Sequence, residues 1–393
     1  MTASRISQFS WQASGAGFLA AFVGFAGSFA VVLQGLVGAG ANPQQAASGL
    51  LIVSVAAGVC GIGLSWFSRM PVAIAWSTPG AALMATMAIP VEGYPAAVGA
   101  FLVSGFAYIA AGSWRPLGRA IAAIPTHLAN AMLAGVLLEL CFAPFRALAE
   151  NPQLALPIIL AWVVGGLVSR LLAVPLAVVA FAIIVVLEGT AAPAHSSSWL
   201  PTVEWVTPIF TWSALLNISV PLVLVTMASQ NISGAAVLQS FGYQPNSGPW
   251  IATTGLATTI TAPFGGYSIN LASITAALCA SPDAHKDPNR RFWAGIMSGI
   301  GLIALGLCSA MVIALVSLAP AMLFQAIAGL ALIGAFCHAT FAAFEQPETR
   351  EASAITFLVT ASGASIAGIS GAFWGLLAGA IYGALRSRFA RLP

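Results

Sequence analysis

Two stretches of this chain share a layout that constrains its fold more than any other feature. Residues 71–90 (PVAIAWSTPGAALMATMAIP) and 263–282 (PFGGYSINLASITAALCASP) each begin and end at a proline, and both spacings are 19 residues (90 − 71 and 282 − 263). In each, an extended-looking segment leads to a residue of N-cap type, Thr78 or Asn270, and then to a helix-forming run. Thr78 is also followed by a proline, which is favoured in the first helical turn. The pattern predicts two half-helices, capped by Thr78 and Asn270.

The composition places these stretches in a lipid bilayer. Hydrophobic residues make up 59% of the chain and charged residues only 6%, and the mean hydropathy is +0.95, whereas soluble proteins carry about a quarter charged residues. The five cysteines lie in apolar segments without metal-ligand spacing. A net charge of +3 is too small and too scattered for a nucleic-acid surface. We therefore expect an all-α integral membrane protein with no cofactor, no metal and no nucleic-acid partner.

Apolar runs predict the membrane spans. A helix needs about 20 apolar residues to cross the hydrocarbon core. Besides the two proline-bracketed stretches, twelve runs approach this length: 17–38, 45–67, 95–113, 126–145, 154–170, 173–188, 213–236, 249–262, 292–318, 320–344, 353–369 and 370–386. The first follows Arg5 without a signal-peptide cleavage pattern, which indicates a retained first span.

Charge asymmetry indicates that the two proline-bracketed stretches also cross the membrane. Cytoplasmic loops collect Lys and Arg. If both stretches cross and the N-terminus is cytoplasmic, 12 of the 13 basic residues lie on the cytoplasmic side, and only Arg146 lies outside. If both are re-entrant, the split falls to 10 and 3. We therefore expect fourteen spans with both termini in the cytoplasm.

The fourteen spans divide into two halves of seven. A polar segment near residues 190–210 separates a first repeat, 1–195, from a second, 205–393. Because seven is odd, the halves enter from opposite faces, as inverted-topology repeats do, and each broken stretch is the third span of its half. A faint alignment of AGVLLELCFAPF with IGAFCHATFAAF places Glu139 opposite His338.

The broken spans suggest an anion site. Extended backbone at membrane depth must be buried in protein or line a cavity, and helix N-termini attract anions. Spans 1, 3, 8 and 10 contain no charged residue, so a small organic carboxylate suits them better than a cation. The predicted substrate-binding residues are all neutral: Gln34, Ser77, Thr78, Gln230, Asn231, Tyr267, Ser268 and Asn270.

Simpler roles stay open for these residues. Thr78 and Asn270 could serve as helix caps without contacting a substrate. Tyr267 could serve in packing alone. Gln230 and Asn231 are harder to assign to packing, because two adjacent amides inside an apolar span are unfavourable unless they are hydrogen-bonded.

Two ionisable residues within spans are candidates for proton coupling. Glu139 and His338 both lie in apolar segments, and histidine changes protonation near neutral pH. Alternatively, Glu139 lies in a watery outer vestibule and His338 donates to a helix carbonyl. The loop 281–291 holds Asp283, His285 and Asp287, but its basic residues favour a solvated turn that sets orientation over a metal site.

Three segments resemble a known family. MASQNISGAAVLQSFGYQPN (227–246), TAPFGGYSINLASITAALCASPDAHKDPNRR (261–291) and TFLVTASG (356–363) are similar to signatures of the benzoate/proton symporter family, BenE. The resemblance runs over nearly the whole chain. It implies a bacterial inner-membrane carrier that imports benzoate with a proton. It also implies the seven-plus-seven fold of uracil and xanthine permeases and related anion transporters. In that fold spans 1–4 and 8–11 form a core domain, spans 5–7 and 12–14 form a gate domain, and substrate binds between the third and tenth spans.

The chain departs from the nucleobase permeases, which place acidic side chains on spans 8 and 10. Here span 8 carries Gln230 and Asn231, and span 10 carries Ser268 and Asn270, which favours an anion over a nucleobase. A nucleobase symporter and an anion channel remain the alternatives, and a homodimer is compatible with the sequence. An enzyme is not expected, because no paired intramembrane acids or metal-ligand cluster occur.

Overall fold

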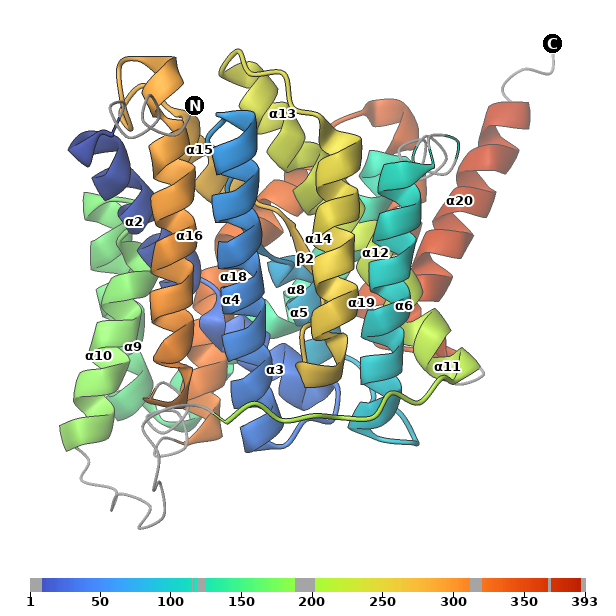
Figure 1. The fold of residues 1–393 in the computed structure, drawn as a ribbon. Helices are drawn as coiled ribbons and strands as arrows, with labels where there is room; N and C mark the ends of the chain where they lie inside the picture. Colours follow the sequence, from blue (N-terminus) through green and yellow to red (C-terminus); the bar gives the residue numbers. More distant parts are fainter. Residues whose placement is uncertain are drawn as a thin grey trace.

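The chain folds into a bundle of mostly parallel and antiparallel helices (Figure 1). A computed structural model describes residues 9–114, 116, 118, 125–187, 202–311, 320–366 and 369–389. Residues 190–201 of the predicted divider around 190–210, and residues 312–318 of the predicted span 292–318, therefore lie outside the described residues. Helix α2 begins and helix α20 ends on the same side of the bundle, at the top in Figure 1.

The first half of the chain forms eight helices and one short strand among its described residues. These are α2 (Trp11–Ala26), α3 (Phe29–Gly38), α4 (Pro43–Ser68), β1 (Ile74–Trp76), α5 (Thr78–Ala85), α6 (Tyr94–Ser113), α8 (Thr126–Glu150), α9 (Pro152–Val168) and α10 (Ala173–Leu187).

The second half repeats this order of long helices around one short strand and a half-helix. Its longer elements are α12 (Val220–Thr226), α13 (Ile232–Ser240), α14 (Ser247–Thr261), β2 (Ile269–Leu271), α15 (Ile274–Ala280), α16 (Phe292–Leu307), α18 (Ala321–Phe344), α19 (Arg350–Ala361) and α20 (Gly371–Phe389). Short helical turns join them: α11 (Trp212–Ala214), η1 (Leu215–Ser219), η2 (Met227–Asn231), η3 (Ala262–Phe264), η4 (Pro288–Arg290) and η5 (Pro347–Thr349).

Several of these helices can cross a membrane. Among the described residues, six helical stretches are long and apolar enough, and α9 and α10 are shorter but also apolar. The protein is therefore all-α and membrane-embedded, as its composition predicts. The full layout of fourteen spans in two inverted repeats stays a prediction.

Two predicted spans differ in detail from the structure. The first is interrupted between α2 and α3, where Gly27 and Ser28 leave the α-helix. The thirteenth, expected over 353–369, ends at Ala361 instead. Gly363 adopts a left-handed φ of 64° just beyond this end, a conformation that terminates helices. Two short paired strands, β3 (Ser365–Ile366) and β4 (Ile369–Ser370), then lead into α20.

The two proline-bracketed stretches meet at the centre of the bundle. Each consists of a three-residue strand followed by a short helix, the predicted order of an extended segment and a half-helix. The strands pair with each other in antiparallel register, with Ala75 opposite Asn270. This pairing joins segments from the two halves of the chain, and β2 lies deep among the helices in Figure 1.

The predicted caps are wrong at both half-helices. Ser77, not Thr78, is the N-cap of α5, and its side chain accepts a hydrogen bond from the Gly80 amide at 3.1 Å. Helix α15 begins only at Ile274, so Asn270 lies inside β2. The physical reason is the strand pairing, because hydrogen bonding to β1 keeps Asn270 extended and delays the helix by three residues.

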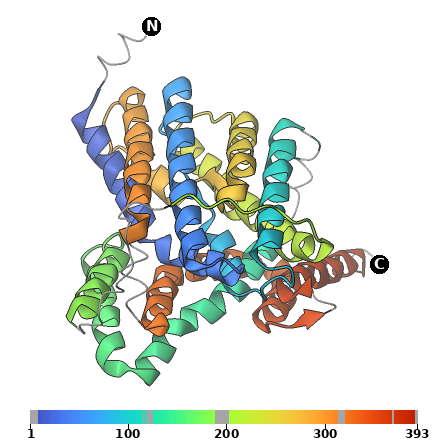
Figure 2. The ribbon, with the colours of Figure 1, turned by 60° about the horizontal axis from the view of Figure 1, so that its bottom comes forward.

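The helices pack in two groups. In one, α4 and α2 pack on α16, and α6 packs on α14; in the other, α8 packs on α18 and α19, α9 on α10, and α19 on α20. Figure 2 shows α8–α10 and α18–α20 along one side of the molecule. This grouping is compatible with the predicted core and gate domains, which remain a prediction.

The loop 281–291 is not simply a solvated turn. Arg291 is only 5% exposed, and its guanidinium donates to the carbonyl oxygens of Ala280 at 2.8 Å and His285 at 2.7 Å. Ala280 is the last residue of α15. Arg291 therefore caps the C-terminal end of this half-helix, where a cation is favourable.

Candidate functional site

The paired strands present a polar face at the start of α5. Successive side chains of a strand alternate between its faces, so the register places Ser77, Ser268 and Asn270 on one face and Trp76 and Ile269 on the other. The amide of Ser77 donates to the carbonyl oxygen of Ser268 at 3.0 Å. All three polar side chains on the first face are fully buried.

A network of hydroxyl groups connects this face to the neighbouring helices. Thr226 Oγ1, at the end of α12, donates to Ser77 Oγ at 2.7 Å and lies 3.3 Å from Ser268 Oγ. Tyr108 of α6 places its hydroxyl 3.0 Å from Ser268 Oγ and donates to the Leu222 carbonyl at 3.3 Å. Because each hydroxyl both donates and accepts, the network satisfies buried polar atoms without any charge.

The outer edge of β2 is bonded by side chains. The amide of Ile269 donates to Thr258 Oγ1 at 2.9 Å, and the amide of Leu271 donates to Asn231 Oδ1 at 3.0 Å. Asn231 is buried at the end of η2, a π-helical turn, and such turns often occur at functional sites. Of the two adjacent amide side chains in this turn, Asn231 is thus hydrogen-bonded to the edge of β2. The other, Gln230, is half-buried.

Asn270 has an unused hydrogen-bond acceptor. Its Nδ2 donates to the Ser268 carbonyl at 3.3 Å, which orients the amide, since the opposite orientation would bring two oxygens together. Its Oδ1 is buried and has no hydrogen-bond partner. A buried acceptor without a donor is unfavourable by about 1–3 kcal/mol, so the site is suited to a ligand that donates to it.

The start of α5 offers few hydrogen-bond donors. Pro79 has no N–H, and the amides of Gly80 and Ala81 donate to Ser77 Oγ and Ser77 O. Thr78, which is half-buried, supplies the remaining amide of this turn and a hydroxyl group. A further donor comes from Gln34 in α3, whose Nε2 is buried without a partner.

Tyr267 braces the strands in this structure. Its hydroxyl donates to the Ser77 carbonyl at 3.1 Å, and its ring centroid lies 6.1 Å from that of Phe101. The side chain is fully buried. Its predicted contact with a substrate ring stays a prediction.

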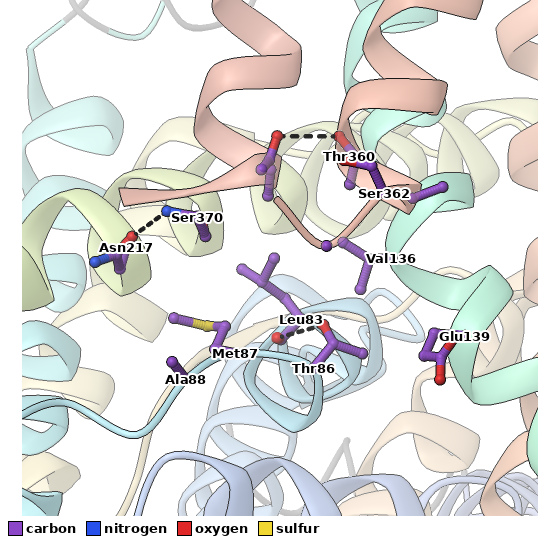
Figure 3. A pocket seen from close by; sticks show the side chains of 14 residues that line it. Leu83, Thr86, Met87, Ala88, Val136, Glu139, Asn217, Thr360, Ser362 and Ser370 are labelled. Atoms are coloured by element: carbon purple, nitrogen blue, oxygen red, sulfur yellow. Dashed lines mark hydrogen bonds between the residues drawn. The ribbon is translucent and has the colours of Figure 1, made fainter. Parts of the chain in front are cut away.

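A cavity of about 340 Å³ opens at the other end of α5 (Figure 3). Its wall combines α5 and the following residues with α8, η1, α19 and the start of α20. The lining residues include Leu83, Thr86, Met87, Val136, Glu139, Asn217, Thr360 and Ser370. Asn217 Oδ1 accepts a hydrogen bond from the Ser370 amide at 2.6 Å. The cavity therefore lies between the two packing groups and does not include the polar face of the strands.

The two candidates for proton coupling lie apart from the strand network. Glu139 forms a salt bridge with Arg146 at 2.5 Å, and both side chains are more than half exposed. His338 is exposed on α18. Neither is hydrogen-bonded to the polar face within the described ranges, and their roles in coupling stay predictions. Among the described residues no group of His, Cys, Asp and Glu could hold a metal ion.

Comparison with known proteins decides the family. The family model described as "Benzoate membrane transport protein" (BenE) matches residues 7–385. The chain belongs to the BenE family. It is 36% identical to the "Inner membrane protein YdcO" of Escherichia coli (strain K12), over 93% of each chain. It is 32% identical to the "Benzoate membrane transport protein" of Acinetobacter baylyi, over 93% of this chain and 92% of that one.

Solved structures show which fold this BenE-family chain shares. It matches the transmembrane domain of the cyanobacterial bicarbonate transporter BicA with a TM-score of 0.59 and 15% identity, over 96% and 98% of the two chains. It also matches SLC26A9 with a TM-score of 0.59 and 12% identity, over 95% of this chain and 65% of that one. The BenE-family chain is therefore a multi-pass inner-membrane transport protein and not an enzyme.

Three residues of the BenE-family site were missing from the sequence-based prediction. Thr226, Tyr108 and Thr258 all bond the strands or their polar face. The sequence could have indicated Tyr108, because a tyrosine inside an apolar span needs a hydrogen-bond partner for its hydroxyl group. Thr226 and Thr258 had none, since a threonine in a membrane helix usually bonds its own backbone.

Proposed function

We propose that this protein imports benzoate, or a similar small aromatic carboxylate, together with a proton by alternating access. The observation that carries the proposal is the polar but uncharged face of β1 and β2 at the start of α5, in a chain of the BenE family. A relative 32% identical to this chain is named a benzoate membrane transport protein.

In this proposal the carboxyl group binds at the start of α5. Thr78 supplies an amide and a hydroxyl, and Asn270 lies on the strand face that leads to it. Gln34 and Gln230 add polar groups from α3 and η2. The aromatic ring packs against Tyr267 and nearby apolar side chains. This arrangement orients a small flat acid by a few polar contacts in an apolar site, as ligand pockets commonly do.

Alternating access requires two bodies that move against each other. We infer that the group containing α2–α6 and α12–α16 is the core domain that carries the substrate, and that α8–α10 and α18–α20 form the gate. The 340 Å³ cavity between the groups supports this division. With the cytoplasmic termini predicted from the charge pattern, the cavity faces the outside and serves as a vestibule.

Two other functions are compatible with parts of the site. A nucleobase symporter is disfavoured, because the nucleobase permeases place acids on spans 8 and 10, where this chain carries the amides Gln230, Asn231 and Asn270 and the hydroxyl of Ser268. An anion channel could use the same polar face, but a channel cannot concentrate its substrate. Competition of benzoate uptake by uracil tests the first alternative. Saturable initial rates that exceed those of protein-free liposomes and increase with the proton gradient test the second.

Uptake of labelled benzoate into proteoliposomes tests the proposed function. We expect saturable initial rates that increase with an inward proton gradient. Protein-free liposomes are an essential control, because a weak acid also crosses the bilayer unaided and accumulates on the alkaline side. Rates that do not saturate, or that equal those of protein-free liposomes at every pH, would contradict the proposal.

Asn270→Ala is expected to weaken benzoate binding about tenfold or more, since a hydrogen bond in a buried site is worth about 1–3 kcal/mol. The measurements are the apparent KM for uptake and the amount of folded protein in the membrane. Asn130→Ala is the matched control, because the Asn130 amide bonds only the Thr126 carbonyl of its own helix. An unchanged KM in Asn270→Ala would remove Asn270 from the site.

A further inference from the structure

We propose that the site binds its aromatic acid in the neutral, protonated form, so that the coupling proton travels on the carboxyl group of the substrate. This inference rests on the proposed function and specifies the chemical species that is carried. It requires no acidic or basic side chain to change protonation during transport.

The first argument is the unused acceptor. Asn270 is fully buried, and its Oδ1 has no hydrogen-bond partner. The bond from one N–H of Nδ2 to the Ser268 carbonyl holds the amide in this orientation. An ionised carboxylate has only acceptor atoms, so its oxygens would be repelled by Asn270 Oδ1. The O–H of a protonated carboxyl group can instead donate a hydrogen bond to Oδ1.

The second argument is the shortage of donors. An ionised carboxylate has about four acceptor positions to satisfy. At the start of α5, Pro79 lacks an N–H, and the amides of Gly80 and Ala81 are already bonded to Ser77. Thr78 offers one amide and one hydroxyl. Gln34 Nε2 of α3 is a further unpartnered donor. These three donor groups are fewer than the four acceptor positions of a carboxylate, and together with the Asn270 acceptor they suit a neutral carboxyl group, whose carbonyl oxygen accepts and whose O–H donates.

The third argument is the absence of a counter-charge. The elements that pack most closely against β2 are β1, α4, α14 and η2, and their only ionisable side chain is the Cys60 thiol of α4. The hydroxyl network adds the phenols of Tyr108 and, beside it, Tyr267, and phenols are neutral at pH 7. An ionised carboxylate buried here would lose its hydration without an ion pair to replace it.

Coupling then follows from the chemistry of the acid. The carboxylate takes up one proton from the side of lower pH, the neutral acid binds and is carried across, and it releases the proton on the other side. Each turnover moves one proton with one carboxylate, so net charge does not cross the membrane. Because a carboxyl group has a pKa of about 4, about one molecule in a thousand is protonated at pH 7.

Equilibrium binding to the purified full-length protein, measured by calorimetry from pH 5.5 to about pH 8, tests this inference with three probes. Benzoate is expected to bind about tenfold more weakly for each pH unit. Benzamide, which is neutral and offers both a carbonyl oxygen and N–H donors, is expected to bind equally at every pH. Benzenesulfonate, which stays ionised, is expected not to compete with benzoate.

The variants Glu139→Gln and His338→Gln test whether the coupling proton is carried by the substrate or by one of these two side chains. Both variants are expected to keep the tenfold dependence of benzoate binding on each pH unit. Loss of that dependence in either variant would overturn the inference, and so would competition by benzenesulfonate or pH-independent binding of benzoate to the wild type. These outcomes leave the proposed function standing, whereas failure of benzoate to bind at any pH overturns the proposed function as well.

Discussion

Replacing Arg291 with alanine is expected to destabilise the protein by about 3 kcal/mol and to reduce benzoate uptake. The guanidinium is buried and donates to Ala280 O, His285 O and, at 3.4 Å, Lys286 O. Hydrogen bonds from charged donors are worth about 1.5–3 kcal/mol each, and their loss would leave the last turn of α15 uncapped. Because β2 and α15 lie in the same proline-bracketed stretch, we expect the uncapping of α15 to disturb the polar face of the strands as well.

Arg290→Ala is the matched control for this effect. Arg290 is its neighbour in sequence, but its side chain is 43% exposed and its contact with Asp287 is long, at 3.8 Å. An exposed pair of this kind contributes about 0–1 kcal/mol. Thermal unfolding in detergent compares the variants, and Arg291→Lys is expected to recover only part of the stability, since an ammonium group lacks the planar fork. Equal unfolding temperatures for Arg291→Ala and Arg290→Ala would contradict the assignment.

Gly58→Ala is expected to separate α4 from α16 and to destabilise the protein by about 1–3 kcal/mol or more. A Cβ atom at Gly58 would lie 2.5 Å from the Gly299 carbonyl oxygen, and a Cβ at Gly299 would lie 2.5 Å from the Gly58 carbonyl oxygen. These distances are far below van der Waals contact, and the obstructing atoms are backbone. Small residues allow such close packing of membrane helices.

Gly63→Ala provides the contrast within the same helix. A Cβ at Gly63 would have no atom within 4 Å, so alanine is expected to be neutral or stabilising by up to about 1 kcal/mol through its higher helix propensity. Unfolding temperature and the fraction of monodisperse protein measure both variants. Similar behaviour of Gly58→Ala and Gly63→Ala would show that the close helix contact is not maintained in the membrane.

The sequence was most informative where the signal is local. The order of strand and half-helix in each proline-bracketed stretch follows from extended-looking residues, a cap-type residue and a helix-forming run, all within 20 residues. The neutral polar residues Ser77, Ser268 and Asn270 were predicted as site residues, and the structure brings them to one face of the strand pair. Their contact with substrate remains a prediction.

The sequence was least informative about which atom of each residue is free. Thr78 and Asn270 were predicted as caps, yet Ser77 caps α5 and Asn270 is part of a strand. Asn231 was predicted to bind substrate, which stays a prediction, and its side-chain oxygen Oδ1 accepts a hydrogen bond from the Leu271 amide. Hydrogen-bond partners of this kind lie on other helices, so no local pattern identifies them.

By itself the sequence determined a membrane-embedded helical protein with two proline-bracketed stretches that contain no charged residue, because composition and hydropathy act over short distances along the chain. Only the tertiary structure decided that the two broken spans pair as strands, since that pairing joins residues as far apart as Ala75 and Asn270. The pairing keeps Asn270 extended and fixes its Nδ2 on a carbonyl. It thereby leaves one buried oxygen without a donor, at the place where the substrate is proposed to bind.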